Sequence, residues 1–258
     1  YKVFSNPELD LTLDMEAALE AAEAAFNLDR SDTGSVKASM NVKGKPDNPR
    51  VNLRADYGGG VLAGLPLGHV GLDTKLIDRV ATLEHLSADS GFGLLELAGQ
   101  GDLRRVFPKG YLASPGDWEK SAFNAMLRIE SLDLSAIPLK ENGTIGRMDA
   151  LLNFKGSGMS METLSAEVST LIAMEDFQSG GMQQSTGIRS RVDGRVQAGT
   201  LCLDLMEVEA AVAYVSAKGS VDLKNMTVDA GFSMETQEVA SLLSVFGLSP
   251  VKGAVAVQ

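Results

Sequence analysis

Hydrophobic and polar residues alternate along most of the chain. The clearest alternating segments are residues 9–13, 36–42, 51–57 and 164–174. A period of two is typical of β-strands that have one apolar and one wet face. Gly, Asn-Gly and Pro-containing stretches separate these segments, as turns between strands would. The pattern predicts a mainly β protein with a largely antiparallel sheet, because only an antiparallel sheet commonly leaves one face in water.

Two segments follow a helical period instead. Residues 15–26 place Met15 and Phe26 on one helical face, with Asp14 as a candidate N-cap. Residues 236–246 show a second apolar stripe of the same kind. The sequence therefore predicts one short helix near 15–26 and another near 236–246.

Two pairs of segments resemble each other at similar spacing. "GSVKASMNVKG" (34–44) returns as "GRMDALLNFKG" (146–156), 112 residues later, and "LLELAGQGDL" (94–103) returns as "YVSAKGSVDL" (214–223), 120 residues later. Any two amphipathic strands share some likeness, but the matching segments follow one another in the same order in both halves of the chain, which favours an internal duplication. We expect a single elongated β domain built from repeats at about 9–130 and 131–235, with a third beginning at 236–258.

A sheet with one apolar face must cover that face, close on itself, or use the face. Two short helices cannot cover so long a sheet, so we expect the sheet to curve into a half-pipe whose apolar face lines a groove. The residues expected to point into this groove are Val36, Ala38, Met40, Val42, Met148, Ala150, Leu152 and Phe154.

Charge and length restrict the possible partners. The 258 residues carry a formal net charge of −11, from 34 acidic and 23 basic residues. An acidic surface repels phosphate backbones, so no nucleic-acid partner is expected. The chain begins with Tyr1, not Met, and holds no run of about 18 apolar residues. We expect a fragment of a longer protein whose membrane anchor lies outside this sequence.

Catalytic and metal-binding patterns are scarce, which predicts a protein that is not an enzyme and that has no cofactor or metal. His69 and His85 are the only histidines and lack a metal-ligand spacing. Asp102, Asp133 and Asp222 share an Asp-Leu context, which is expected to form turns at strand ends. Cys202 is the only cysteine and is expected to pack as a small apolar residue.

Methionine is frequent: there are 11 Met and a single Trp. Flexible, unbranched side chains suit a surface that accommodates variable apolar ligands, although methionine equally fills gaps in a core. The sequence leaves both interpretations open.

Several stretches resemble the AsmA/TamB family of bacterial envelope proteins. The likeness rests on "SLDLSAIPL", "NGTIGRMDALLNFKGSG", "LSAEVSTLIAM", "MEVEAAVAYVSAKGSVDL" and "EVASLLSVFGLSPVKGAVAV", and extends from about residue 9 to the end. The resemblance implies a β-taco, an elongated half-pipe with an apolar interior. It also implies an inner-membrane-anchored parent protein that crosses the periplasm of a Gram-negative bacterium and carries phospholipid to the outer membrane.

Three functions remain open from the sequence. The first is a non-enzymatic conduit segment that shields phospholipid acyl chains in an apolar groove. The second is a periplasmic scaffold or chaperone that helps outer-membrane proteins assemble by adding their strands to its sheet edges. The third is a closed structural β-solenoid, whose apolar positions would be fully packed.

Overall fold

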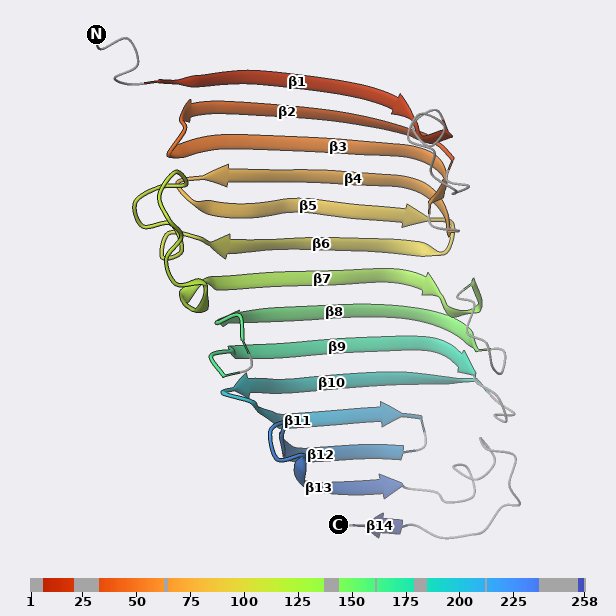
Figure 1. Cartoon of the computed structure of the whole chain (residues 1–258). Coiled ribbons are helices and arrows are strands. Elements are labelled where there is room, and N and C mark those ends of the chain that lie inside the picture. Colours follow the sequence, from red (N-terminus) through yellow and green to blue (C-terminus); the bar gives the residue numbers. More distant parts are fainter. Residues whose placement is uncertain are drawn as a thin grey trace. The chain divides into compact units, whose positions relative to one another are not determined.

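Strand is the dominant element of the fold (Figure 1). The computed structural model describes residues 7–20, 33–62, 65–136, 144–160, 162–178, 185–211, 213–236 and 255–257. The strands are β1 (Leu9–Ala18), β2 (Ser35–Lys45), β3 (Asn48–Leu62), β4 (Leu65–Ile77), β5 (Val80–Ser90), β6 (Gly93–Asp102), β7 (Ala122–Asp133), β8 (Ile145–Ser157), β9 (Ser165–Gln178), β10 (Thr186–Gln197), β11 (Thr200–Ala210), β12 (Ala213–Asp222), β13 (Thr227–Thr236) and β14 (Val255–Val257). Two single-turn 3₁₀ helices, η1 (Trp118–Lys120) and η2 (Leu134–Ala136), flank β7.

The chain divides into two compact units. The first comprises Tyr1–Met126 with Ser157–Met159, and the second comprises Leu127–Gly156 with Ser160–Gln258. Strands β1 to β6 in the first unit, and β9 to β14 in the second, pair antiparallel with their neighbours in chain order. The predicted fold class, mainly β with a largely antiparallel sheet, is confirmed. The predicted repeat boundaries stay a prediction.

The two units share the same irregularities at a spacing of 120 residues. The β4–β5 register shifts at Asp73/Thr74, and the β10–β11 register shifts at Asp193/Gly194. The next pairs also shift at matching places, at Leu83/Leu86 between β5 and β6 and at Leu203/Met206 between β11 and β12. Ordinary strand alternation does not require a bulge, so shared bulges support the interpretation of an internal duplication.

The segments 112 residues apart also match in backbone conformation. Gly34 (φ +117°) immediately precedes β2, and Gly146 (φ +126°) is the second residue of β8. A Cβ on Gly34 would lie 2.8 Å from the carbonyl oxygen of Gly59, and one on Gly146 would lie 2.8 Å from that of Glu175. Both positions therefore require glycine for conformation and for space.

The predicted helix near 15–26 is wrong at its beginning. Residues 15–18 belong to β1, where Met15 lies opposite Ala38 and the Glu16 carboxylate is 3.1 Å from Lys37 Nζ. Asp14, expected as an N-cap, is also a strand residue. The period of two that begins at Leu9 continues through Met15, and pairing with β2 outweighs the helix propensity of this Ala- and Glu-rich stretch. Leu19 and Glu20 are helical, and residues 21–26 lie outside the described residues.

The second predicted helix, near 236–246, lies almost wholly outside the described residues. Its first residue, Thr236, is the last residue of β13. Within the described parts of the chain, no helix is long and apolar enough to cross a membrane.

A small aromatic cluster follows β6 in the first unit. The Phe107 ring centroid lies 4.7 Å from that of Tyr111 and 5.6 Å from that of Trp118. Arg79, in the β4–β5 turn, donates from its guanidinium to the carbonyl oxygens of Phe107 and Pro108. This cluster ties the segment between β6 and β7 to the end of the sheet.

Candidate functional site: an apolar sheet face

The apolar face of the first unit is built from cross-strand rows. Each row takes one residue from each of β1 to β6, and the register places these residues directly opposite one another. The four rows comprise Leu11, Val42, Val51, Leu76, Ala81 and Gly101; Leu13, Met40, Leu53, Thr74, Leu83 and Gly99; Met15, Ala38, Ala55, Leu72, Leu86 and Leu97; and Ala17, Val36, Tyr57, Val70, Ala88 and Leu95. None of these positions carries a charge.

The second unit carries an apolar face of the same kind on β9 to β13. Thr170 and Ser190 are its only hydroxyl residues, and no charged residue belongs to it. Its five rows comprise Met174, Ile188, Ala210 and Ala213; Ile172, Ser190, Val208, Val215 and Met234; Thr170, Val192, Met206, Ala217 and Phe232; Val168, Gly194, Leu203, Gly219 and Ala230; and Ala166, Val196, Leu201, Val221 and Val228.

The bulges keep these faces apolar. In β5 the apolar residues Leu83 and Leu86 are three positions apart, so regular alternation would send them to opposite faces. The extra residue, Glu84, restores both leucines to the same face. Leu203 and Met206 of β11 stand in the same relation, with Asp204 as the extra residue.

The residues predicted to line a groove lie on these faces. Val36, Ala38, Met40 and Val42 are half-buried and alternate along β2 with residues of its other face, of which Lys37, Ser39 and Lys43 are exposed. In β8, Met148, Ala150, Leu152 and Phe154 are also half-buried and alternate with exposed residues such as Asn153.

The β8 residues share the face of β9 that carries Ala166. A Cβ built on Gly156 would lie 2.7 Å from the Ala166 Cβ, so the two positions point to the same side of the sheet. Because side chains alternate along a strand, Phe154, Leu152 and Ala150 point to that side as well. The structure thus places four of the predicted residues on the apolar face of each unit. That these faces form a groove stays a prediction.

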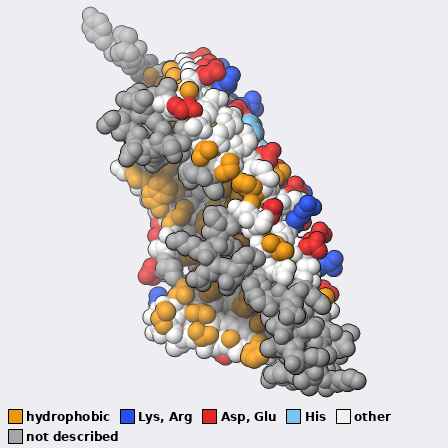
Figure 2. Space-filling model, turned by 90° about the vertical axis from the view of Figure 1, so that its right-hand side faces the viewer, with side chains coloured by type: hydrophobic (Ala, Val, Ile, Leu, Met, Phe, Trp, Pro, Cys, Tyr) orange, Lys and Arg blue, Asp and Glu red, His pale blue; other side chains and the backbone are white. Residues whose placement is uncertain are grey.

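Few apolar side chains are buried. Among the described residues, the buried hydrophobic side chains are Tyr57 and Val106 in the first unit and Leu134 and Ala166 in the second. Phe232 of the apolar face is 63% exposed and Val228 is 69% exposed. Figure 2 shows hydrophobic side chains reaching the visible surface in patches. The described residues of each unit therefore leave apolar surface accessible to a partner.

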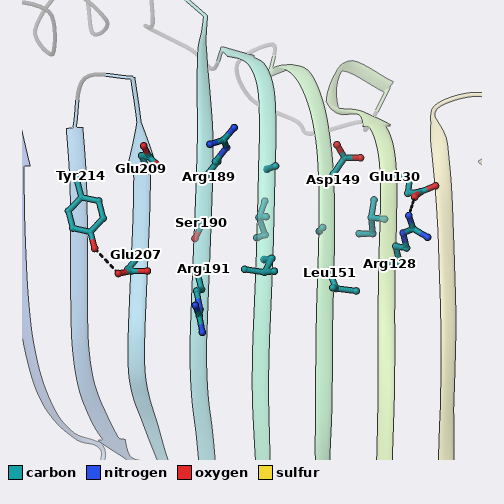
Figure 3. Close-up of a pocket in the computed structure, with 15 residues that line it drawn as sticks. Arg128, Glu130, Asp149, Leu151, Arg189, Ser190, Arg191, Glu207, Glu209 and Tyr214 are labelled. Atoms are coloured by element: carbon teal, nitrogen blue, oxygen red, sulfur yellow. Dashed lines mark hydrogen bonds and ion pairs between the residues drawn. The ribbon is translucent and has the colours of Figure 1, made fainter.

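The opposite face of the second unit carries charged residues and a shallow hollow that the sequence did not predict. The hollow has a volume of about 670 Å³ and is lined by residues of β7 to β12 (Figure 3). Tyr214 Oη donates to Glu207 Oε1 at 2.8 Å, and this bond raises the pKa of Tyr214. The alternating segments "IRSR" and "EVE" carry a weak signal for it, because they place Arg189 and Arg191 opposite Glu209 and Glu207. Opposite charges thus face one another across the strands, while the Arg191 guanidinium pairs with Asp193 of its own strand, at 2.8 Å between Nε and Oδ2.

The Asp-Leu motifs form turns, as predicted. Asp102, Asp133 and Asp222 each end a strand and accept a hydrogen bond from the backbone N–H two residues later, at 3.0, 2.9 and 2.8 Å respectively. His69 and His85 are exposed strand residues, and Cys202 is a half-buried residue of β11. Within the described part of the chain, no cluster of His, Cys, Asp or Glu could hold a metal ion.

Comparisons with protein-family models, curated proteins and solved structures find no match to this chain. The function is therefore inferred from the two faces of the sheet.

Proposed function

We propose that this chain is a non-enzymatic segment of a conduit that shields phospholipid acyl chains in the periplasm, between the inner and outer membranes of a Gram-negative bacterium. The observation that carries the proposal is the uncharged apolar face of each unit, which the described residues leave only half-buried. A closed structural solenoid would bury these positions, and the exposure of Phe232 and Val228 speaks against it.

The chemistry of the face suits acyl chains. Each CH₂ group removed from water contributes about 0.8 kcal/mol, so affinity grows with the length of chain covered. The face offers no charge to bind a headgroup within it, and the headgroup stays in water. Successive rows differ little in polarity. A lipid can therefore move from one row to the next without meeting a position that binds it much more tightly. Methionines such as Met40 and Met206 adapt to chains of different shape.

The test is native mass spectrometry, with lipid extraction, of the chain purified from a Gram-negative host. We expect phospholipid to co-purify with the wild type and to be lost in Met40→Lys and Leu152→Lys, because each variant places an ammonium group on the apolar face. The matched controls are Ser39→Lys and Asn153→Lys, which add the same charge at exposed neighbours on the other face. These two should keep their lipid.

Two results would contradict the proposal. The first is a folded wild-type chain that carries no lipid. The second is equal loss of lipid in the apolar-face variants and in their controls, which would trace the effect to charge or stability. Circular dichroism of each variant establishes that the strands are intact before lipid is measured.

A further inference from the structure

Within the described part of the chain, the outer edge of β1 has no partner strand. Among the residues that the structure describes, β1 pairs with β2 alone, over all ten of its residues, and no strand pairs with its other edge. Leu11, Leu13 and Met15 are 54, 54 and 52% exposed, although their cross-strand neighbours in β2 are half-buried. The rows of the apolar face therefore end at an edge that no described strand covers. A long edge without proline or bulge readily accepts another strand.

The other face of β1 is acidic. Asp10, Asp14 and Glu16 occupy it together with Thr12. Lys43 Nζ lies 3.9 Å from Asp10 Oδ1, and Lys37 Nζ lies 3.1 Å from Glu16 Oε1.

Asp14 has no basic residue directly opposite on β2. It faces Ser39, while Thr12 accepts a hydrogen bond from the Asn41 side chain at 2.9 Å. The lysines of β2 therefore compensate only part of the acidic charge of β1. A strand added to the outer edge would lie next to the same acids and could compensate the rest.

We propose that the free edge of β1 binds an extended peptide in which apolar residues alternate with Lys or Arg. The peptide backbone would complete the hydrogen bonds of the edge, as in other cases of strand addition. Its apolar side chains would extend the rows that end at Leu11, Leu13 and Met15, and its basic side chains would lie opposite Asp10, Asp14 and Glu16.

A second copy of this chain fits the edge poorly. Antiparallel pairing of β1 with itself about Leu13 would place Asp10 opposite Glu16 twice, and like charges directly opposite destabilise a sheet. The inference does not depend on lipid binding: it concerns a strand edge and an acidic row, whereas the proposed function concerns the apolar face.

The probe is a fluorescent peptide with the sequence of residues 35–45, in which Lys replaces Ser39, the residue that lies opposite Asp14; the rest of this segment already pairs with β1 in the required pattern. Fluorescence anisotropy should show saturable binding that weakens at high salt. A peptide with its Lys residues replaced by Glu should bind at least about tenfold more weakly. A version N-methylated at alternate residues keeps every side chain but cannot form the backbone ladder, so it should not bind.

The site is located by exchanging charges. Asp14→Lys should weaken binding of the basic peptide and should allow the Glu-containing peptide to bind. Asp229→Lys, at an exposed position on β13, is the matched control and should change neither affinity.

The proposal is overturned if the unmodified peptide does not bind, if the N-methylated peptide binds equally well, or if both lysine variants behave alike. Dimerisation through β1, detected by sedimentation and abolished in Asp14→Lys, would also overturn it in favour of a second copy. Lipid content, measured on the same samples, separates the two proposals: loss of lipid in Met40→Lys with peptide binding intact leaves the edge site standing.

Discussion

Glu84 and Asp204 hold equivalent places in the two units. Each is the extra residue of a β-bulge, and each carboxylate pairs with a basic side chain of the preceding strand. Glu84 Oε1 lies 2.6 Å from Lys75 Nζ, and Asp204 Oδ1 lies 3.2 Å from Arg195 Nη2. Both bulges turn an irregular sequence into a continuous apolar face, so the face depends on a residue that is itself charged and points away from it.

Deleting Glu84 should be tolerated, because β5 has one more residue than each of its neighbours at this point. Without Glu84, Leu83 and Leu86 become next-but-one neighbours and stay on the apolar face. We expect the free energy of unfolding in urea to fall by no more than about 2 kcal/mol. Deleting Asn52 from the regular strand β3 is the control: it turns half of that strand over, and should abolish cooperative unfolding. Equal effects of the two deletions would refute this account of the bulge.

Gly219 approaches the neighbouring strand too closely for a side chain. A Cβ there would lie 2.7 Å from the carbonyl oxygen of Asp229 and 2.9 Å from the Ala230 Cα. Gly219→Ala should therefore destabilise the protein by about 1–3 kcal/mol. Gly231→Ala on β13 is the matched control, because nothing lies within 4 Å of its Cβ position, and it should be neutral or slightly stabilising. Thermal and urea unfolding of the two variants measure the difference.

The same contrast recurs in the first unit. A Cβ on Gly99 would lie 2.7 Å from the carbonyl oxygen of Asn124, whereas Gly101 has open space around it. Gly99→Ala should therefore lower the free energy of unfolding more than Gly101→Ala does. Equal losses would show that the close approach of the strands is not the reason for a glycine at position 99.

Stability at acid pH should depend on Asp102. Hydrogen bonds from the Arg104 side chain and backbone N–H lower the pKa of Asp102 from 3.8 to about 2. The folded state thus binds fewer protons than the unfolded state between these values. The contribution to stability is present above about pH 4 and is lost as the pH falls through 2. Urea unfolding of wild type and Asp102→Asn should converge as the pH falls across this window.

Arg104→Ala separates the two causes of the shift. This variant removes the side-chain hydrogen bond and keeps the backbone N–H, so the pKa of Asp102 should rise but stay below its ordinary value. The titration is followed by NMR of the carboxyl carbon. An unchanged pKa would show that the Arg104 side chain does not hold the carboxylate.

The β10–β11 turn offers a stabilising substitution. Ala198 (φ +48°) and Gly199 (φ +84°) both adopt positive φ, as the central residues of a type I′ turn do. Alanine is costly there and asparagine is favoured, so Ala198→Asn should raise the free energy of unfolding by up to about 1 kcal/mol. Ala213→Asn, a half-buried position on the apolar face, should destabilise instead. A loss of stability in Ala198→Asn would contradict the assigned turn.

The sequence by itself determined that the chain is mainly strand and, where the alternation is regular, which side of each strand is apolar. Side chains alternate along any extended backbone, so Val36, Met40, Leu152 and Phe154 could be assigned to their faces without knowing their neighbours. The turns that follow Asp102 and Asp222 were equally local, since an aspartate accepts hydrogen bonds from its own chain two residues on.

Only the tertiary structure decided the features that depend on partners distant in sequence. Met15 belongs to a strand because Ala38 lies opposite, although its own segment also has helical periodicity. The bulge at Glu84 and the polar hollow beside Tyr214 and Glu207 arise from the register between strands. The free edge of β1 is likewise a property of the assembled sheet. Register is fixed by pairing across the sheet, and the sequence of one strand does not specify which residue of the next strand lies opposite.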